Sequence, residues 1–295
     1  MQKLPVPKIT SVSVRKVVAD AGKYMGDWLA SPRPKDLGYP GQQLTPYDQY
    51  RRKKLLKLLD PVFFEEKSVL QVGCGPGDLL LEIAKYNPKE IFGLDTSPEE
   101  IEIARQRLQA QNIVADLTVI SDPLLPYPDS SFDVVLIVQQ LQLITNGDLL
   151  RAFLAELCRV SRQWLVIIED TGEQRQQGEG QVVRTVEYYQ EFYREHKFYL
   201  RTINSLDVTA TKTVVHWLGD PGQTLRWVFS PLLYLMGFPR QWLKRPDFAN
   251  QQPASKLAES LQKLILFLTP GLDDVFKSGV ETTKMVFERE KLFRR

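Results

Sequence analysis

The chain has 295 residues, of which 43% are apolar and 25% are charged, and its net charge is +2. These values predict a soluble globular protein, long enough for one large domain or for one domain with a sizeable insertion. Because the basic residues are dispersed, the charge does not indicate nucleic acid or a strongly acidic partner. The two cysteines, Cys74 and Cys158, and the two histidines have no metal-ligand spacing, so we expect reduced thiols, no metal site and a cytoplasmic protein.

No segment predicts a passage through a membrane. The first residues lack the apolar core of a signal peptide. The longest apolar stretch, from Trp227 to Leu243, is interrupted by proline and glycine and is too short to cross a bilayer about 30 Å thick.

Helical and extended patterns alternate along most of the chain after an N-terminal segment, residues 1–45, that is rich in Pro and Gly. The patterns predict helices at 45–59, 78–86, 98–110, 149–160 and 184–198, and strands at 68–72, 90–94, 115–120, 133–138, 164–169 and 199–206. Several strands are aliphatic runs, which are typical of parallel strands covered on both faces. A Gln-, Gly- and Glu-rich stretch at 172–180 predicts a loop.

The most informative segment joins the first predicted strand to the helix after it. Gly73, Gly75 and Gly77 alternate in this turn, where a side chain would block the close approach of a ligand and resist unusual φ values. The next strand ends at Asp95, where a carboxylate can accept hydrogen bonds from both hydroxyls of a ribose. Together these residues predict a cofactor that contains a ribose.

The G-x-G-x-G spacing resembles motif I of the class I S-adenosylmethionine-dependent methyltransferases, in contrast to the G-x-G-x-x-G of dehydrogenases. Further segments resemble this family in the same order: the acidic strand end 95–97, the loop 122–133, which holds the adenine in that family, and the strands 134–138 and 164–170. The resemblance implies that the glycine turn runs beside the methionine part and the ribose of the cofactor, and that Thr96 flanks the adenine. The chain is most similar to the small-molecule branch, which includes the ubiquinone and menaquinone methyltransferases. The resemblance covers about residues 50–205.

This resemblance implies an α/β fold, with a Rossmann-like, seven-stranded, mostly parallel sheet and helices on both faces. The alternating tail at 283–291 resembles the antiparallel final strand of the family. We therefore expect an N-terminal arm or cap at 1–45, a methyltransferase core at 46–206 plus 281–293, and a helical, aromatic-rich insertion at 207–280. The insertion has several interpretations: a lid over the substrate, a dimer surface, ordinary core, or a contact with a membrane surface.

The resemblance also implies a set of site residues. Those expected to bind S-adenosylmethionine, or its product S-adenosylhomocysteine, are Gln71, Gly73, Cys74, Gly75, Gly77, Asp95, Thr96, Asp122, Pro123, Val138 and Gln139. Those expected to contact the substrate are Tyr24, Gln142 and Trp217. Candidate general bases are Glu169, Asp170 and His216, and each also has a structural interpretation.

Two departures from the family pattern change what these residues can do. The family usually has an acid at position 71, where this chain has Gln71, whose amide oxygen can still accept a hydrogen bond from the cofactor's ammonium group. Many relatives carry a histidine pair where this chain has Gln142 and Leu143, so a mechanism that uses those histidines fails here.

We therefore expect an enzyme, a methyltransferase that moves a methyl group to a small, fairly apolar acceptor by in-line displacement. Two alternatives are a catalytically silent binding or scaffold protein with the same fold and an NAD-dependent oxidoreductase. The expected partner is the small-molecule acceptor, and a homodimer is one outcome for the insertion.

Overall fold

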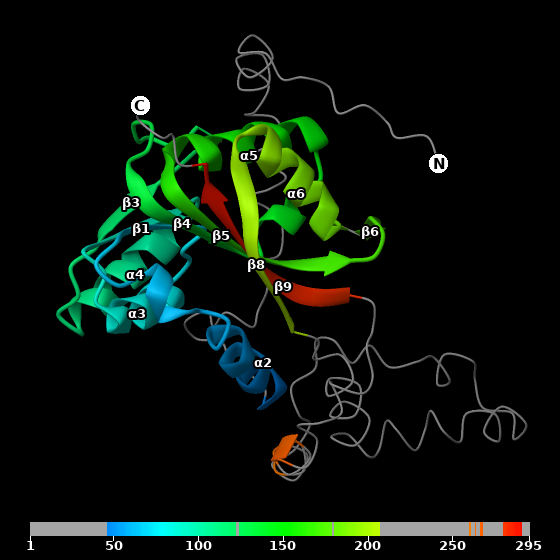
Figure 1. The fold of residues 1–295 in the computed structure, drawn as a ribbon. Coiled ribbons are helices and arrows are strands. Elements are labelled where there is room, and N and C mark those ends of the chain that lie inside the picture. Colours follow the sequence, from blue (N-terminus) through cyan, green and yellow to red (C-terminus); the bar gives the residue numbers. More distant parts are fainter. Residues whose placement is uncertain are drawn as a thin grey trace, which may run out of the picture. The chain divides into compact units, whose positions relative to one another are not determined.

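The computed structural model describes residues 46–121, 124–178, 180–206, 260, 263, 266–267 and 280–290 (Figure 1). The chain divides into two compact units. One contains residues 58–205 and 282–290 of the described part, and the other contains helix α2 (Pro46–Leu56). The predicted arm at 1–45 and most of the predicted insertion at 207–280 lie outside the described residues, so those domain boundaries stay predictions.

The sheet of the first unit confirms the predicted architecture. It has seven strands in the order β3-β2-β1-β4-β5-β9-β8, with the antiparallel β9 inserted between β5 and β8 (Figure 1). The strands β1, β2, β3, β4 and β5 pair in parallel. Their bounds are β1 Ser68–Val72, β2 Glu90–Asp95, β3 Asp116–Val119, β4 Phe132–Val138, β5 Ser161–Gly172, β8 Phe198–Leu206 and β9 Val280–Arg289.

Helices cover both faces of this sheet, because the central strands are apolar on both sides. All five residues of β1 are buried. One core cluster joins Leu80 of α3 and Ile101 and Leu108 of α4 to Ile91 of β2. The other joins α5 and α6 to the opposite face, where Leu94 of β2 lies. The alternation of Ile91 and Leu94 between two clusters follows from the period-2 geometry of a strand.

Helices α4, α5 and α6 each begin at a side-chain cap, whereas α3 begins after Gly77 without one. Their bounds are α3 Asp78–Ile83, α4 Pro98–Gln109, α5 Gly147–Val160 and α6 Val186–Glu195. The side chains of Ser97, Asn146 and Thr185 each accept a hydrogen bond from a backbone N–H in the first turn of α4, α5 and α6. Such caps satisfy donors that the helix itself leaves unpaired, and each is worth about 1 kcal/mol.

The prediction of a loop at 172–180 was wrong. Strand β5 continues to Gly172, and a two-stranded antiparallel hairpin follows, with β6 at Gln176–Gly178 and β7 at Gln181–Val183. Gly180 has a φ of 74°, a conformation that glycine adopts at little cost and that a tight hairpin turn requires. The sequence holds no strand signal for β6, because its residues are polar or glycine and all three are exposed.

We expect three glycine substitutions to lower the free energy of unfolding by graded amounts. Gly77 has a φ of 83°, and a Cβ there would lie 3.1 Å from the Cβ of Ala104, so Gly77→Ala should cost about 1–3 kcal/mol. Gly75→Ala meets no atom within 4 Å but has a φ of 51°, so about 1 kcal/mol is expected. Gly178→Ala is the control, because it has open space and no positive φ. Urea unfolding measures all three, and an equal loss for Gly77→Ala and Gly178→Ala would contradict this account.

Candidate functional site

The glycine turn after β1 is tied directly to the end of β2. Gly73, Gly75 and Gly77 have φ values of 73°, 51° and 83°. The backbone N–H groups of Gly73 and Cys74 both donate to the carbonyl oxygen of Leu94, each at 2.8 Å. All three glycines therefore sit in the left-handed region that favours glycine, as their predicted role in a tight turn requires.

The carboxylate of Asp95, the last residue of β2, accepts a hydrogen bond from the same turn. Its side chain is 1% exposed. Its Oδ2 accepts the N–H of Gly75 at 2.8 Å, and its Oδ1 accepts the N–H of Ser97 at 2.9 Å. Carboxylate oxygens accept more than one hydrogen bond, so these contacts are compatible with binding a ribose. Thr96, predicted to flank the adenine, is half-buried next to Asp95.

Three buried glutamines that lie in β1 or follow β4 have acceptor oxygens without donors among the described residues. Gln71 of β1 is 2% exposed, and Gln139 and Gln142, which follow β4, are 0% and 3% exposed. Within the described residues, the Oε1 atom of each has no hydrogen-bond partner. An unpaired buried carbonyl costs about 1–3 kcal/mol, and a ligand that donates to it recovers this. Val138, the last residue of β4, is also buried, as a residue that contacts a cofactor at this edge would be.

The segment after β4 touches the glycine turn. A Cβ built on Gly73 would lie 2.6 Å from the Cγ of Gln140, so the Gln140 side chain packs against that glycine. The glycine turn after β1 and the segment after β4, which directly follows the predicted residue Gln139, are thus neighbours at one edge of the sheet. This contact agrees with the parallel pairing of β1 and β4, which places their carboxyl ends side by side.

A buried carboxyl group and a buried guanidinium hold the short 3-10 turn Leu141–Leu143 that follows β4. The carboxyl of Glu169 is fully buried and accepts the N–H groups of Gln140 at 2.7 Å and Leu141 at 2.9 Å on Oε1, and that of Gln142 at 3.3 Å on Oε2. At the other end, the Arg184 guanidinium donates to the carbonyls of Leu141 at 2.9 Å and Ile144 at 2.6 Å. The carboxyl oxygens accept the N–H groups at the start of the turn, and the guanidinium donates to carbonyls of the turn, including that of Leu141, which also accepts the N–H of Ile144 at 3.2 Å.

Burial raises the pKa of Glu169 to about 8, and the backbone N–H groups of Leu141 and Gln140 oppose this shift. The general-base role of Glu169 stays a prediction, and its observed contacts are with the turn. Asp170 is half-buried and accepts hydrogen bonds from the Gln139 amide and the Thr282 hydroxyl. The third candidate base, His216, lies outside the described residues, as do Tyr24, Trp217, Asp122 and Pro123.

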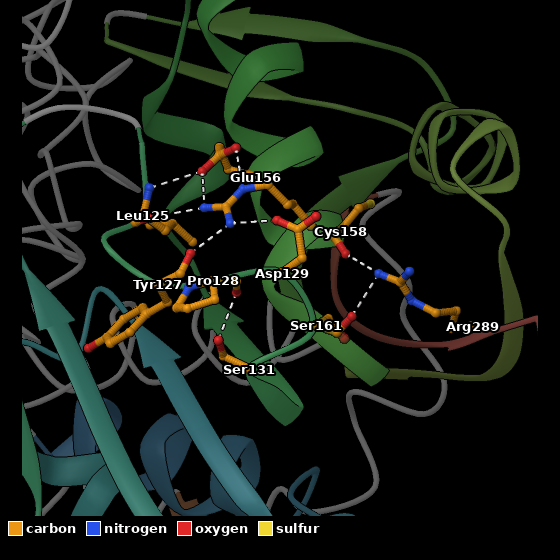
Figure 2. Close-up of polar contacts among 10 residues, drawn as sticks. Leu125, Tyr127, Pro128, Asp129, Ser131, Glu156, Cys158, Ser161 and Arg289 are labelled. Atoms are coloured by element: carbon orange, nitrogen blue, oxygen red, sulfur yellow. Dashed lines mark hydrogen bonds and ion pairs between the residues drawn. The ribbon is translucent and has the colours of Figure 1, made fainter.

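The segment that follows Asp122 and Pro123 is anchored by Arg159 and Glu156 of α5, and Figure 2 shows Glu156 beside Leu125. The Arg159 guanidinium donates to the carbonyls of Leu125 at 2.9 Å and Tyr127 at 2.6 Å. It also pairs with Glu156, whose Oε2 accepts the N–H of Leu125 at 3.1 Å. The predicted adenine loop is therefore fixed to α5 by a side chain from each of two successive helical turns.

The sequence reasoning passed over Arg159, Glu156 and Arg184. Glu156 and Arg159 have the i,i+3 spacing of an ion pair on the predicted helix 149–160, a signal that could have identified them. Arg184 carries no comparable local signal, because the two carbonyls that it contacts in the turn after β4 lie 40 and 43 residues away.

Within the part of the chain that the structure describes, no group of three or more His, Cys, Asp or Glu side chains could hold a metal ion. Among those same residues, no helix is both long enough and apolar enough to span a bilayer.

We expect Glu169→Gln to change how stability depends on pH. The unfolded chain ionises Glu169 above about pH 4.5, whereas the native form keeps its proton up to about pH 8. The free energy of unfolding should therefore fall as pH rises through this window, by about 1.4 kcal/mol for each pKa unit. The variant lacks the titrating group, so its decline should be shallower.

Urea unfolding at several pH values between about 5 and 8 measures this difference. Glu173→Gln is the matched control, because Glu173 is exposed. If Glu169→Gln and Glu173→Gln show the same decline, Glu169 does not titrate in this window.

Comparisons with known proteins agree with this geometry. The pattern of the methyltransferase domain family matches residues 69–163. Demethylmenaquinone methyltransferase of Porphyromonas gingivalis is 31% identical over 128 residues, which are 41% of this chain and 50% of that protein. Ajmaline N-methyltransferase of Rauvolfia serpentina is 32% identical over 104 residues, 35% of each protein. Fatty-acid O-methyltransferase of Mycolicibacterium smegmatis is 38% identical over 100 residues, 33% of this chain and 34% of that protein.

This chain thus spans about half or less of the length of these relatives. Two solved structures are similar in fold. Coclaurine N-methyltransferase bound to N-methylheliamine and S-adenosylhomocysteine has a TM-score of 0.52 and 15% identity, with 95% of this chain and 88% of that chain covered. The [4+2]-cyclase SpnF has a TM-score of 0.55 and 15% identity, with 98% and 99% covered. Residues 69–163 of this chain thus match the methyltransferase domain family, and its sheet order and glycine turn agree with the resemblance to the class I methyltransferases that use S-adenosylmethionine.

Proposed function

We propose that this protein is a methyltransferase that binds S-adenosylmethionine and transfers its methyl group to a small, fairly apolar molecule. The observation that carries the proposal is the contact between the Asp95 carboxylate and the N–H of Gly75, 2.8 Å apart. This hydrogen bond connects Asp95, the acid expected to bind the ribose, to the glycine turn, which is expected to lie beside the methionine part of the cofactor. Both therefore lie at the same edge of the sheet. The match of residues 69–163 to the methyltransferase domain family supports the same assignment.

The residues present fit this cofactor. The turn leaves open space over Gly75, where a Cβ would meet no atom within 4 Å. The buried Gln71 oxygen, unpaired among the described residues, can accept a hydrogen bond from an ammonium group in place of the usual acid. We assign Gly73, Cys74, Gly75 and Gly77 to the backbone contacts and Asp95 to the ribose hydroxyls. We also assign Asp122, Pro123 and Thr96 to the adenine and Val138 to the wall of the pocket.

When bound, S-adenosylmethionine supplies a methyl group on a positively charged sulfur, and displacement by a lone pair of the acceptor leaves S-adenosylhomocysteine. The chain has to align the acceptor and exclude water, and alignment alone can lower a barrier by roughly 7–11 kcal/mol. A general base is needed only when the acceptor atom loses a proton, and Glu169, Asp170 and His216 are the candidates for that task.

The proposal of a small, fairly apolar acceptor is supported by the relatives. The three named above act, by their names, on demethylmenaquinone, on ajmaline and on fatty acids. The buried Gln142 oxygen has no donor among the described residues, so it offers one polar contact to such an acceptor. Tyr24 and Trp217 are proposed to complete the substrate pocket.

A second candidate is a protein that binds without transferring a methyl group. The observation that favours it is the side-chain set after β4, where Gln142 and Leu143 stand in place of the histidine pair of many relatives. A thermal-shift measurement with S-adenosylmethionine, S-adenosylhomocysteine and NAD separates the candidates, because a ligand that binds the native form raises its melting temperature. A shift with the two sulfur compounds supports the methyltransferase. A shift with NAD alone favours an oxidoreductase, and no shift with any of them favours a scaffold.

We expect Asp95→Ala to weaken the binding of S-adenosylhomocysteine by about tenfold or more, because the ribose hydroxyls and two backbone N–H groups lose their acceptor. Isothermal titration calorimetry measures the affinity, and circular dichroism checks that the variant is folded. Asp116→Ala is the control, since Asp116 is exposed and begins β3 at the opposite edge of the sheet. Unchanged affinity in a folded Asp95→Ala protein would refute the ribose role.

A further inference from the structure

Gln139 has an unusual backbone for its residue type. It follows β4 with a φ of 51°, in the left-handed region that side chains other than glycine rarely adopt. Its N–H donates to the carbonyl of Ile168 in β5 at 2.8 Å, which holds it in this conformation. Strained residues of this kind gather at binding sites, and Gln139 is fully buried at the carboxyl edge of the sheet.

The orientation of the Gln139 amide follows from its neighbour. The Nε2 of Gln139 donates to the Oδ1 of Asp170 at 3.3 Å, and the same Oδ1 accepts the Thr282 hydroxyl at 2.7 Å. A carboxylate accepts hydrogen bonds and cannot donate them, so it must face the nitrogen of the amide. The Gln139 oxygen therefore points away from Asp170. Three neighbouring strands contribute to this arrangement, through the residue after β4, Asp170 of β5 and Thr282 of β9.

The Gln139 oxygen is left for a ligand. It is buried, and no donor among the described residues reaches it. The adjacent Gln140 side chain packs against Gly73, so this segment borders the glycine turn assigned to the cofactor. S-adenosylmethionine carries hydrogen-bond donors on its ammonium, ribose and adenine groups, and a fixed carbonyl oxygen suits any of them.

We propose that Asp170 is a positioning residue, which together with Thr282 orients the Gln139 amide so that its oxygen accepts a hydrogen bond from the bound cofactor. This inference rests on the proposed function. In this role Asp170 needs only an oxygen atom that accepts hydrogen bonds from Gln139 and Thr282. Its negative charge and its strength as a base are not required. Asparagine at position 170 would retain an oxygen for both donors, whereas alanine would not.

The test is the affinity of the full chain for S-adenosylhomocysteine, measured by calorimetry. Gln139→Met and Asp170→Ala should each weaken binding, by up to about tenfold for the loss of one hydrogen bond. Asp170→Asn should recover most of the affinity that Asp170→Ala loses. The double variant Asp170→Ala with Gln139→Met should be little worse than Gln139→Met, since both changes remove the same contact. Gln109→Met, on an exposed residue of α4, is the matched control.

If Asp170→Ala does not fold, Thr282→Val tests the same arrangement, because valine keeps the shape of threonine but lacks its hydroxyl. We expect Thr282→Val to lose less affinity for S-adenosylhomocysteine than Gln139→Met does. Two results would overturn the inference: unchanged affinity in folded Gln139→Met, or a loss in Asp170→Asn as large as in Asp170→Ala. The second would show that the charge itself matters. A wild-type protein that binds no S-adenosylhomocysteine would instead refute the proposed function, so the two failures are distinguishable.

Discussion

Two buried carboxyl groups, Asp95 and Glu169, satisfy the backbone of the turns that follow neighbouring strands. Asp95 ends β2 and accepts the N–H of Gly75 in the turn after β1. Glu169 lies in β5 and accepts three N–H groups of the turn after β4. A turn at the edge of a parallel sheet leaves its backbone donors without strand partners, and burying them unpaired is costly. The side chains of adjacent strands supply the missing acceptors, and this constraint shapes the whole edge of the sheet.

The same arrangement sets the chemistry of the edge. Carboxyl groups satisfy these backbone donors, and the amide oxygens of Gln71, Gln139 and Gln142 have no donor among the described residues. Amide oxygens accept hydrogen bonds but do not take up protons near neutral pH. This edge therefore suits the binding and alignment of donor-bearing ligands, and a methyl transfer from a sulfonium asks mainly for alignment.

The anchoring of the adenine loop shows how helices contribute to the same edge. Arg159 and Glu156 of α5 bind the backbone of the segment at 125–127. The nearby Arg289 of β9 donates to the carbonyls of Cys158 and Ser161, at the junction of α5 and β5 (Figure 2). Hydrogen bonds from charged groups are stronger than those between neutral groups. These arginines therefore add to the packing that fixes the loop and the last strand.

The sequence by itself determined the strand, glycine turn and helix at 68–83, the sheet class and the acid at the end of β2. Each of these is written in local patterns: aliphatic runs, three glycines that meet a steric need, and capping residues. The hairpin at 176–183 was missed because its first strand is polar and exposed, and periodicity then gives no signal. Only the tertiary structure decided which buried polar groups pair. Thr282 and Asp170 are 112 residues apart, and Arg184 reaches carbonyls 40 and 43 residues away. Such partners are chosen by strand order and register, which bring distant side chains together after the local elements have formed.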